Sequence, residues 1–184
     1  MHQFEILERC QTTGMPDLCI ARGMYAAMSK TMRNLLATFP YKLEFGRGTY
    51  WLGDEGLNYI YAGHDHITTG WQPEVLQLRD ELLQEIAYSN YDRIGQFFNH
   101  ILINRYLPGQ KLNPHRDNEP ELRGPIASIS FGDSAIFTYG NKHIALHDGD
   151  LLFSSRAFNN STTHSARPPI NAGTRYNLTF RTIN

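Results

Sequence analysis

The second half of this chain is a succession of short strand-like segments separated by turns, and this pattern limits the possible folds most. Segments rich in β-branched and aromatic residues predict strands over residues 99–107, 126–131, 135–139, 143–147, 150–153, 162–166 and 174–181. Turn-forming pairs such as Gly132-Asp133, Gly140-Asn141 and Asp148-Gly149 lie between them. Such a run of strands is typical of antiparallel sheets that close into a two-sheet roll.

Helices are predicted before these strands. Apolar residues three and four positions apart over residues 16–38 predict an amphipathic helix, and a second helix is predicted from Pro73 to a stop at Asn90. Residues 46–63 are rich in glycine and aromatic residues and predict short strands joined by turns. Helices followed by antiparallel strands indicate the α+β class, with a two-sheet roll over residues 99–184.

Length and composition favour a single domain over residues 1–184. The chain has 184 residues, 41% of them hydrophobic, which suffices for one sizeable core. Two cysteines, Cys10 and Cys19, are too few for a disulfide framework or a four-cysteine zinc site, so a reducing cytoplasm is expected. No signal peptide or apolar run of about 20 residues is recognisable, so we expect no membrane partner. A cytoplasmic monomer is the expectation, with nuclear or viral origin left open.

The charge distribution leaves room for nucleic acid only at a local surface. The net charge is −1, which gives no overall attraction to a polyanion. Basic residues nevertheless outnumber acidic ones from Arg22 to Arg47, and no acidic residue follows Asp150. Solvated helix faces and loops explain the first stretch equally well.

A candidate metal site begins with His115 and Asp117 in the segment NPHRDNEP. In extended backbone, residues two apart point to the same face, so this imidazole and carboxylate could bind one ion. His164, on a later predicted strand, is the candidate third ligand. Two histidines and one carboxylate form the facial triad of non-haem iron(II) oxygenases. By itself a His-x-Asp pair is a weak signal, and we expect most of the histidines, such as His64, His66, His143 and His147, to be surface or turn residues.

The C-terminal strand RYNLTFR supplies the context for that triad. Its alternation places Arg175, Asn177 and Arg181 on one face and the apolar residues on the other. An edge strand with an exposed basic face would show the same alternation. A guanidinium is also well suited to bind a dicarboxylate such as 2-oxoglutarate through paired hydrogen bonds.

Together these motifs resemble the AlkB family of Fe(II)/2-oxoglutarate-dependent dioxygenases. The segment LINRYLPGQKLNPHRDNEPELRGPIASISFG is similar to the family's strand, turn and HxD region, and RYNLTFR is similar to its terminal strand. The resemblance extends from about residue 46 to residue 184. It implies a double-stranded β-helix (jelly roll) with the N-terminal helices packed on one sheet.

The resemblance also implies roles for individual residues. His115, Asp117 and His164 would bind Fe(II); Arg175, Asn104 and Tyr106 would hold the distal carboxylate of 2-oxoglutarate; Asn177 and Arg181 would support the end near the metal. Ordinary sheet pairing is the alternative for Asn104 and Tyr106. Residues 46–63 would form a substrate-recognition lid, in which the candidate substrate contacts are Arg47, Tyr50, Trp51, Tyr59 and Tyr61. Trp51 and Tyr59 are the preferred pair, and structural packing is the competing explanation.

Three features depart from the family pattern. Family members often carry an arginine about four residues before the distal histidine, whereas Arg156 lies eight residues before His164. Ser165 replaces the more usual glycine after that histidine, and the Asn118-Glu119 segment is one residue shorter. These changes bear on the substrate more than on the chemistry.

The implied activity uses dioxygen and 2-oxoglutarate to demethylate N-alkylated bases, with single-stranded DNA or RNA preferred because an unpaired base is easier to extrude. The nearest alternative keeps the oxygenase chemistry but acts on a protein, lipid or small molecule. A second alternative is a binding module with an idle iron site. A zinc hydrolase could use the same triad, but this leaves Arg175 and Arg181 unexplained.

Overall fold

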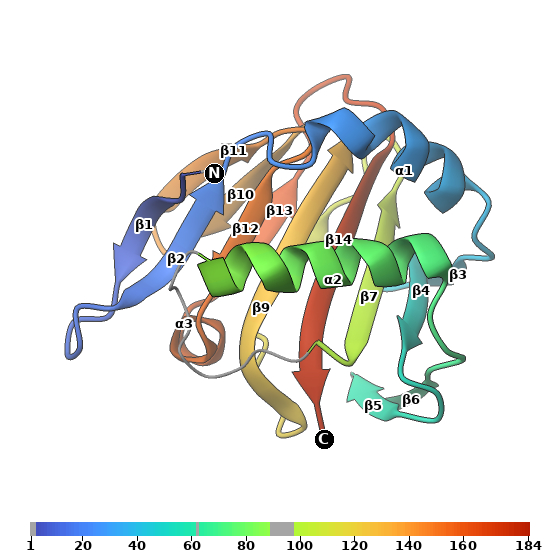
Figure 1. The fold of residues 1–184 in the computed structure, drawn as a ribbon. Coiled ribbons are helices and arrows are strands. Elements are labelled where there is room, and N and C mark those ends of the chain that lie inside the picture. Colours follow the sequence, from blue (N-terminus) through green and yellow to red (C-terminus); the bar gives the residue numbers. More distant parts are fainter. Residues whose placement is uncertain (1–2, 62, 89–97) are drawn as a thin grey trace.

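The structure is a computed structural model that describes residues 3–61, 63–88 and 98–184 (Figure 1). Within these residues, no helix has the length and apolar character needed to cross a membrane. The helical elements are a 3₁₀ turn (Ala26–Met28), α1 (Ser29–Ala37), α2 (Pro73–Tyr88) and α3 (Arg156–Ser161). The strands are β1 (Glu5–Arg9), β2 (Pro16–Ala21), β3 (Lys42–Glu44), β4 (Arg47–Gly53), β5 (Asn58–Tyr61), β6 (His64–Ile67), β7 (His100–Tyr106), β8 (Leu112–His115), β9 (Leu122–Gly132), β10 (Ala135–Tyr139), β11 (Lys142–Leu146), β12 (Leu151–Ser154), β13 (His164–Arg167) and β14 (Arg175–Ile183).

Two antiparallel sheets and a small hairpin account for these strands. The larger sheet has the order β1-β2-β12-β9-β14-β7-β4-β3, and the smaller has the order β11-β10-β13-β8. Strands β5 and β6 form a separate hairpin. Because β14 lies between β7 and β9 and pairs with both, it is a central strand and not an exposed edge.

Side-chain alternation gives the larger sheet two buried faces. On one face, Ile129, Leu178 and Phe180 share a hydrophobic cluster with Met32 of α1 and Leu78 of α2, and both helices lie across this face in Figure 1. On the other face, Ile20 and Leu152 pack with Phe137 and Leu146 of the smaller sheet. The polar residues of β14 also point into the space between the two sheets.

The prediction of a helix over residues 16–38 is wrong for its first half. Residues 16–21 form strand β2, which pairs with β1 and β12, and regular α-helix begins only at Ser29. Leu18 and Ile20 face the smaller sheet while Cys19 and Ala21 face the helices, so both faces of this strand are buried. A strand with two buried faces has no polar face, and its apolar run is therefore compatible with a helical stripe.

The other elements follow the predictions more closely. Each of the seven strands predicted from residue 99 onward corresponds to one strand, namely β7 and β9–β14. The second helix begins at Pro73 as predicted; its predicted stop, Asn90, lies outside the described residues. Strands β1, β3, β6 and β8 and helix α3 were not predicted.

Candidate metal centre and adjoining pocket

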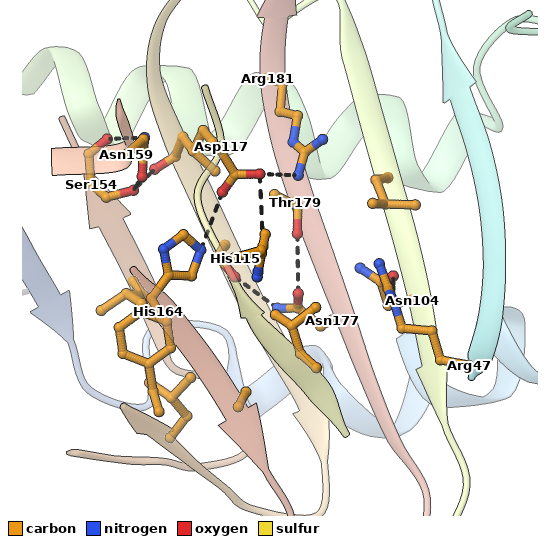
Figure 2. Close-up of a pocket in the computed structure, with 18 of the residues that line it drawn as sticks. Arg47, Asn104, His115, Asp117, Ser154, Asn159, His164, Asn177, Thr179 and Arg181 are labelled. Atoms are coloured by element: carbon orange, nitrogen blue, oxygen red, sulfur yellow. Dashed lines mark hydrogen bonds and ion pairs between the residues drawn. The ribbon is translucent and has the colours of Figure 1, made fainter. Parts of the chain in front are cut away.

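Strand pairing brings the three candidate metal ligands together. His115 ends β8, His164 begins β13, and the two residues are register partners in the smaller sheet. Asp117 follows two residues after His115. One ligand atom from each of the three side chains lies within 4.8 Å of the others, and Figure 2 shows the three side chains pointing toward one another.

Backbone carbonyl groups set the orientation of both imidazole rings. His115 Nδ1 lies 2.9 Å from the carbonyl oxygen of Asn113, and His164 Nδ1 lies 3.2 Å from that of Thr162. A carbonyl only accepts, so Nδ1 carries the proton in each ring and Nε2 keeps its lone pair. The Nε2 atoms lie 3.9 Å and 3.2 Å from the carboxylate oxygens of Asp117. Both rings therefore present a metal-binding nitrogen to the same point.

Asp117 is buried and negatively charged. Burial alone would raise its pKa, but its polar contacts, chiefly the Arg181 guanidinium, outweigh burial and hold the pKa well below its ordinary value. Arg181 Nη2 lies 3.0 Å from Asp117 Oδ1. Burial is also the main cause that lowers the pKa of His115. At neutral pH the centre therefore offers a carboxylate and a neutral imidazole, the forms that bind a metal ion.

Arg175 lies in the same pocket and has no acidic partner among the described residues. It is 6% exposed, and its Nη2 donates to the hydroxyl of Ser130 at 2.9 Å. Its guanidinium carbon lies 5.4 Å from the ring centre of Tyr106. Burial lowers the pKa of Arg175, as expected for a cation that has lost water without gaining an anion. The surroundings of Arg175 therefore favour a negatively charged ligand.

The amides beside Arg175 are held by neighbouring side chains. Arg47, which is 3% exposed, donates from Nε to Asn104 Oδ1 at 2.6 Å. This bond leaves the NH₂ group of Asn104 as its free hydrogen-bonding end. Asn177, by contrast, donates to Ser128 and the Ile129 carbonyl and accepts from Thr179. Its amide is thus fully used by the protein in this structure.

The aromatic candidates for substrate contact separate into three environments. Tyr61 lines the pocket, and Trp51 is partly exposed and stacks on His66 at 4.1 Å. Tyr59 is fully buried, and its hydroxyl accepts from Arg181 at 3.2 Å, which contradicts its preferred role as a face for the substrate. Tyr50 is directed to the helix-covered face of the sheet, where it packs on Phe39.

The expectation that His66 is a surface or turn residue is also wrong. It is 7% exposed and lies on strand β6 beneath the Trp51 ring. His64, by contrast, is exposed, as are His143 and His147.

The sequence matches the model of the 2OG-Fe(II) oxygenase superfamily over residues 13–181. The chain belongs to this superfamily. It is 42% identical over 144 residues to the alpha-ketoglutarate-dependent dioxygenase AlkB of Escherichia coli (strain K12), a match that covers 67% of this chain and 62% of that protein. The DNA oxidative demethylase ALKBH2 of Bos taurus is 35% identical over 150 residues, which cover 71% of this chain and 51% of that protein.

These matches confirm the AlkB-like resemblance, although the aligned part is less than two thirds of either relative's own length. The solved structure of OsALKBH1 has a TM-score of 0.63 to this chain at 19% sequence identity and covers 98% of this chain and 100% of that chain. This similarity supports the mostly-β α+β fold with large antiparallel sheets.

The donor set of this member of the superfamily fits Fe(II) and a dicarboxylate. Two imidazole nitrogens and one carboxylate oxygen are the ligands of the iron facial triad. Arg175 Nε and Arg181 Nε in the pocket, and the hydroxyl of Tyr106, whose ring lies beside Arg175, are buried without a hydrogen-bond partner among the described residues. Buried donors of this kind are costly when unpaired, so a ligand with carboxylate oxygens would stabilise them.

Several pocket residues were missed by sequence reasoning. Ser128 and Ser130 of β9 hold Asn177 and Arg175, and their alternation along β9 is a signal that could have identified them. Ser154 and Asn159 form a buried hydrogen bond of 2.8 Å beside the metal ligands. Asn159 lies on the unpredicted helix α3, so no periodicity marked it.

Proposed function

We propose that this chain is an Fe(II)- and 2-oxoglutarate-dependent dioxygenase that oxidatively removes alkyl groups from bases in single-stranded DNA or RNA. In this proposal the two sheets are the halves of a double-stranded β-helix. The observation that carries it is the convergence of His115, Asp117 and His164 in one pocket with Arg175, a buried cation without an acidic partner among the described residues.

His115 Nε2, His164 Nε2 and the Asp117 carboxylate would hold the iron. When bound, iron with 2-oxoglutarate and dioxygen supplies the oxidising power that hydroxylates an N-alkyl carbon, with succinate and carbon dioxide as coproducts. The chain's contribution is orientation and charge. Arg181 keeps Asp117 ionised and fixed, and Tyr59 holds Arg181 from the other side.

The distal carboxylate of 2-oxoglutarate would bind at Arg175, Tyr106 and Asn104. The free donors at this position are Arg175 Nε, the Tyr106 hydroxyl and the amide NH₂ that Arg47 leaves free on Asn104. A carboxylate accepts several such hydrogen bonds and would neutralise the buried guanidinium. Arg181 and Asn177 would act near the metal end, Arg181 through its ion pair with Asp117.

The substrate would meet the pocket at Tyr61 and Trp51, with Arg47 supplying positive charge nearby. Curated relatives include a protein named DNA oxidative demethylase ALKBH2, which supports nucleic acid as the substrate class. An aromatic side chain can stack on any extruded base. Extrusion costs least when the base is unpaired, so single strands are the preferred substrate of the proposal.

The test is an assay of a single-stranded oligonucleotide that carries 1-methyladenine, with Fe(II), 2-oxoglutarate and air. We expect formaldehyde and succinate in equal amounts, and slower reaction with the same base in a duplex. The His115→Ala variant should form neither product, whereas His143→Ala, which changes an exposed histidine on β11, should match the unchanged protein. Succinate without formaldehyde for every methylated oligonucleotide tried would reject nucleic-acid demethylation.

A further inference from the structure

Arg156 connects the helix that precedes His164 to the segment that carries Asp117. Its Nη1 donates to the backbone carbonyl of Asp117 at 2.9 Å, and its Nη2 donates to the carbonyl of Glu119 at 3.0 Å. One guanidinium therefore holds two carbonyls that are two residues apart. The bonds span 39 and 37 positions of sequence, so they fix one loop relative to another.

The backbone of Arg156 is itself held in place. Arg156 is the first residue of α3, and the side chain of Ser155 caps that helix by accepting from the Phe158 amide. The Ser155 hydroxyl in turn donates to Asp17, and the Ser155 amide donates to the Asp17 carbonyl. Helix α3 is thereby attached to β2 of the larger sheet, which gives Arg156 a rigid starting point.

The segment that Arg156 holds has little support of its own. Residues 116–119 form neither helix nor strand, so no sheet ladder satisfies the Asp117 carbonyl. The Glu119 carbonyl accepts one further bond, from the Leu122 amide at 3.2 Å. The position of the Asp117 backbone determines whether its carboxylate reaches Arg181 and both histidines. Contacts that fix the backbone of Asp117 therefore also fix the position of its carboxylate in the metal centre.

We propose that Arg156 is a positioning residue of the metal centre, which holds the backbone of residues 117–119 so that the Asp117 carboxylate faces His115 and His164. The inference rests on the proposed function only in taking this triad as the iron site. It explains the displaced arginine in the sequence: Arg156, eight residues before His164, reaches the Asp117 segment from the start of α3.

Charge and position predict opposite effects of removing Arg156. A guanidinium bonded to the backbone of a metal ligand repels a bound cation, so its loss by charge alone would strengthen Fe(II) binding. Loss of a group that orients a ligand weakens metal binding, typically about 10- to 100-fold. The direction of the change in affinity therefore separates the two effects.

The experiment is an anaerobic titration of the full chain with Fe(II) at saturating 2-oxoglutarate, followed by the visible charge-transfer band of the chelate. We expect Arg156→Ala to weaken Fe(II) binding at least about tenfold. Arg156→Lys, which keeps the charge but cannot span both carbonyls, should fall between Arg156→Ala and the unchanged protein. The lysine variant can also be titrated if the alanine variant fails to fold.

Arg123→Ala is the matched control. Arg123 also donates to backbone carbonyls of this turn, those of Pro120 and Leu122, but it does not hold Asp117 or Glu119. The Fe(II) affinity of Arg123→Ala should equal that of the unchanged protein. Unchanged or tighter binding in Arg156→Ala, or equal weakening in both alanine variants, would overturn the role of Arg156. If the unchanged protein gives no band, the proposed iron site fails instead, and the inference fails with it.

Discussion

Arg175 shows most clearly how the surroundings of one residue indicate the charge of the ligand that its site favours. A buried guanidinium without a carboxylate partner costs free energy that a folded protein normally avoids. Arg175 pairs only with a serine hydroxyl and the face of Tyr106 within the described residues, although Arg181, six positions further along the same face of β14, has Asp117. The cost is explained if an anion completes the site in the working protein.

Replacement of Arg175 by Met should weaken 2-oxoglutarate binding by about 30-fold or more, because truncation of a buried charge pair costs at least about 2 kcal/mol. Arg175→Lys should recover part of this loss through charge, without the paired hydrogen bonds. Arg105→Met is the control, since Arg105 stacks on Tyr41 at 4.4 Å, away from the pocket. The measurement is the dependence of the chelate band on 2-oxoglutarate concentration. Equal affinity in Arg175→Met and the unchanged protein would refute the assignment.

His100 should make the protein sensitive to acid. It is fully buried, pairs in register with Arg181, and has no hydrogen-bond partner on either ring nitrogen among the residues that the structure describes. Burial, followed by the nearby Arg181 charge, lowers its pKa to about 3. As pH falls from about 6.5 toward 3, the unfolded chain takes up a proton that the folded chain refuses. Stability from this residue should therefore be lost through that window, by roughly 1.4 kcal/mol per pH unit at most.

The variant His100→Phe keeps a ring among Trp51 and Tyr59 but removes the titration. Its acid-unfolding midpoint, followed by circular dichroism, should lie at lower pH than that of the unchanged protein. His143→Phe, at an exposed position, should leave the midpoint in place. A midpoint that is the same in all three proteins would show that His100 does not titrate as its burial requires.

Sequence reasoning succeeded for side chains whose direction follows from the backbone alone. The alternation along residues 175–181 fixes which of their side chains share a face, whatever the tertiary structure. Tyr59 and His66 are different, because their burial depends on how the β5–β6 hairpin packs against Trp51 and Arg181. Local pattern carries no information about that packing.

At the level of elements, the prediction that failed is the helix that was expected to begin at residue 16. A run of apolar residues fits both a buried strand and one face of a helix, and residues 16–21 lie in a strand between β1 and β12, the second of which is more than a hundred positions away. The turn-separated strands after residue 99 were predictable since glycine and proline mark their ends. Helix α3 has only six residues, too short for a periodic signal.

The reactivity of the two cysteines tests whether residues 16–21 form the buried strand β2. Burial in β2 raises the pKa of Cys19 to about 12, whereas hydrogen bonds from Thr12 and Thr13 lower the pKa of Cys10 to about 7. A thiolate is the reactive form, so Cys10 should react with a thiol reagent at once at pH 8, and Cys19 should react only when the protein unfolds. The measurement is mass spectrometry of labelled protein over time.

Cys10→Ser provides the control, since it should remove the fast phase and keep the slow one. If Cys19 reacts as fast as Cys10 in the native protein, residues 16–21 are not the buried strand described above. The comparison needs no assumption about iron or substrate.

For the whole molecule, metal and cosubstrate should stabilise the fold because they bind only the folded chain. Mn(II) can replace iron to avoid oxidation. At about 100 times the dissociation constant, binding contributes about 2.7 kcal/mol, which corresponds to a rise in Tm of roughly 5–10 °C for a chain of this size. The measurement is thermal unfolding with Mn(II) and 2-oxoglutarate together. His115→Ala should lose most of the shift, and an equal shift in this variant would place the metal elsewhere.

The most direct test of the central claim is a crystal structure of the protein with Mn(II) and 2-oxoglutarate. We expect one metal ion bound by His115 Nε2, His164 Nε2 and the Asp117 carboxylate, with the distal carboxylate of 2-oxoglutarate on Arg175. A bound metal ion without His164 among its ligands, or a cosubstrate carboxylate remote from Arg175, would contradict the account.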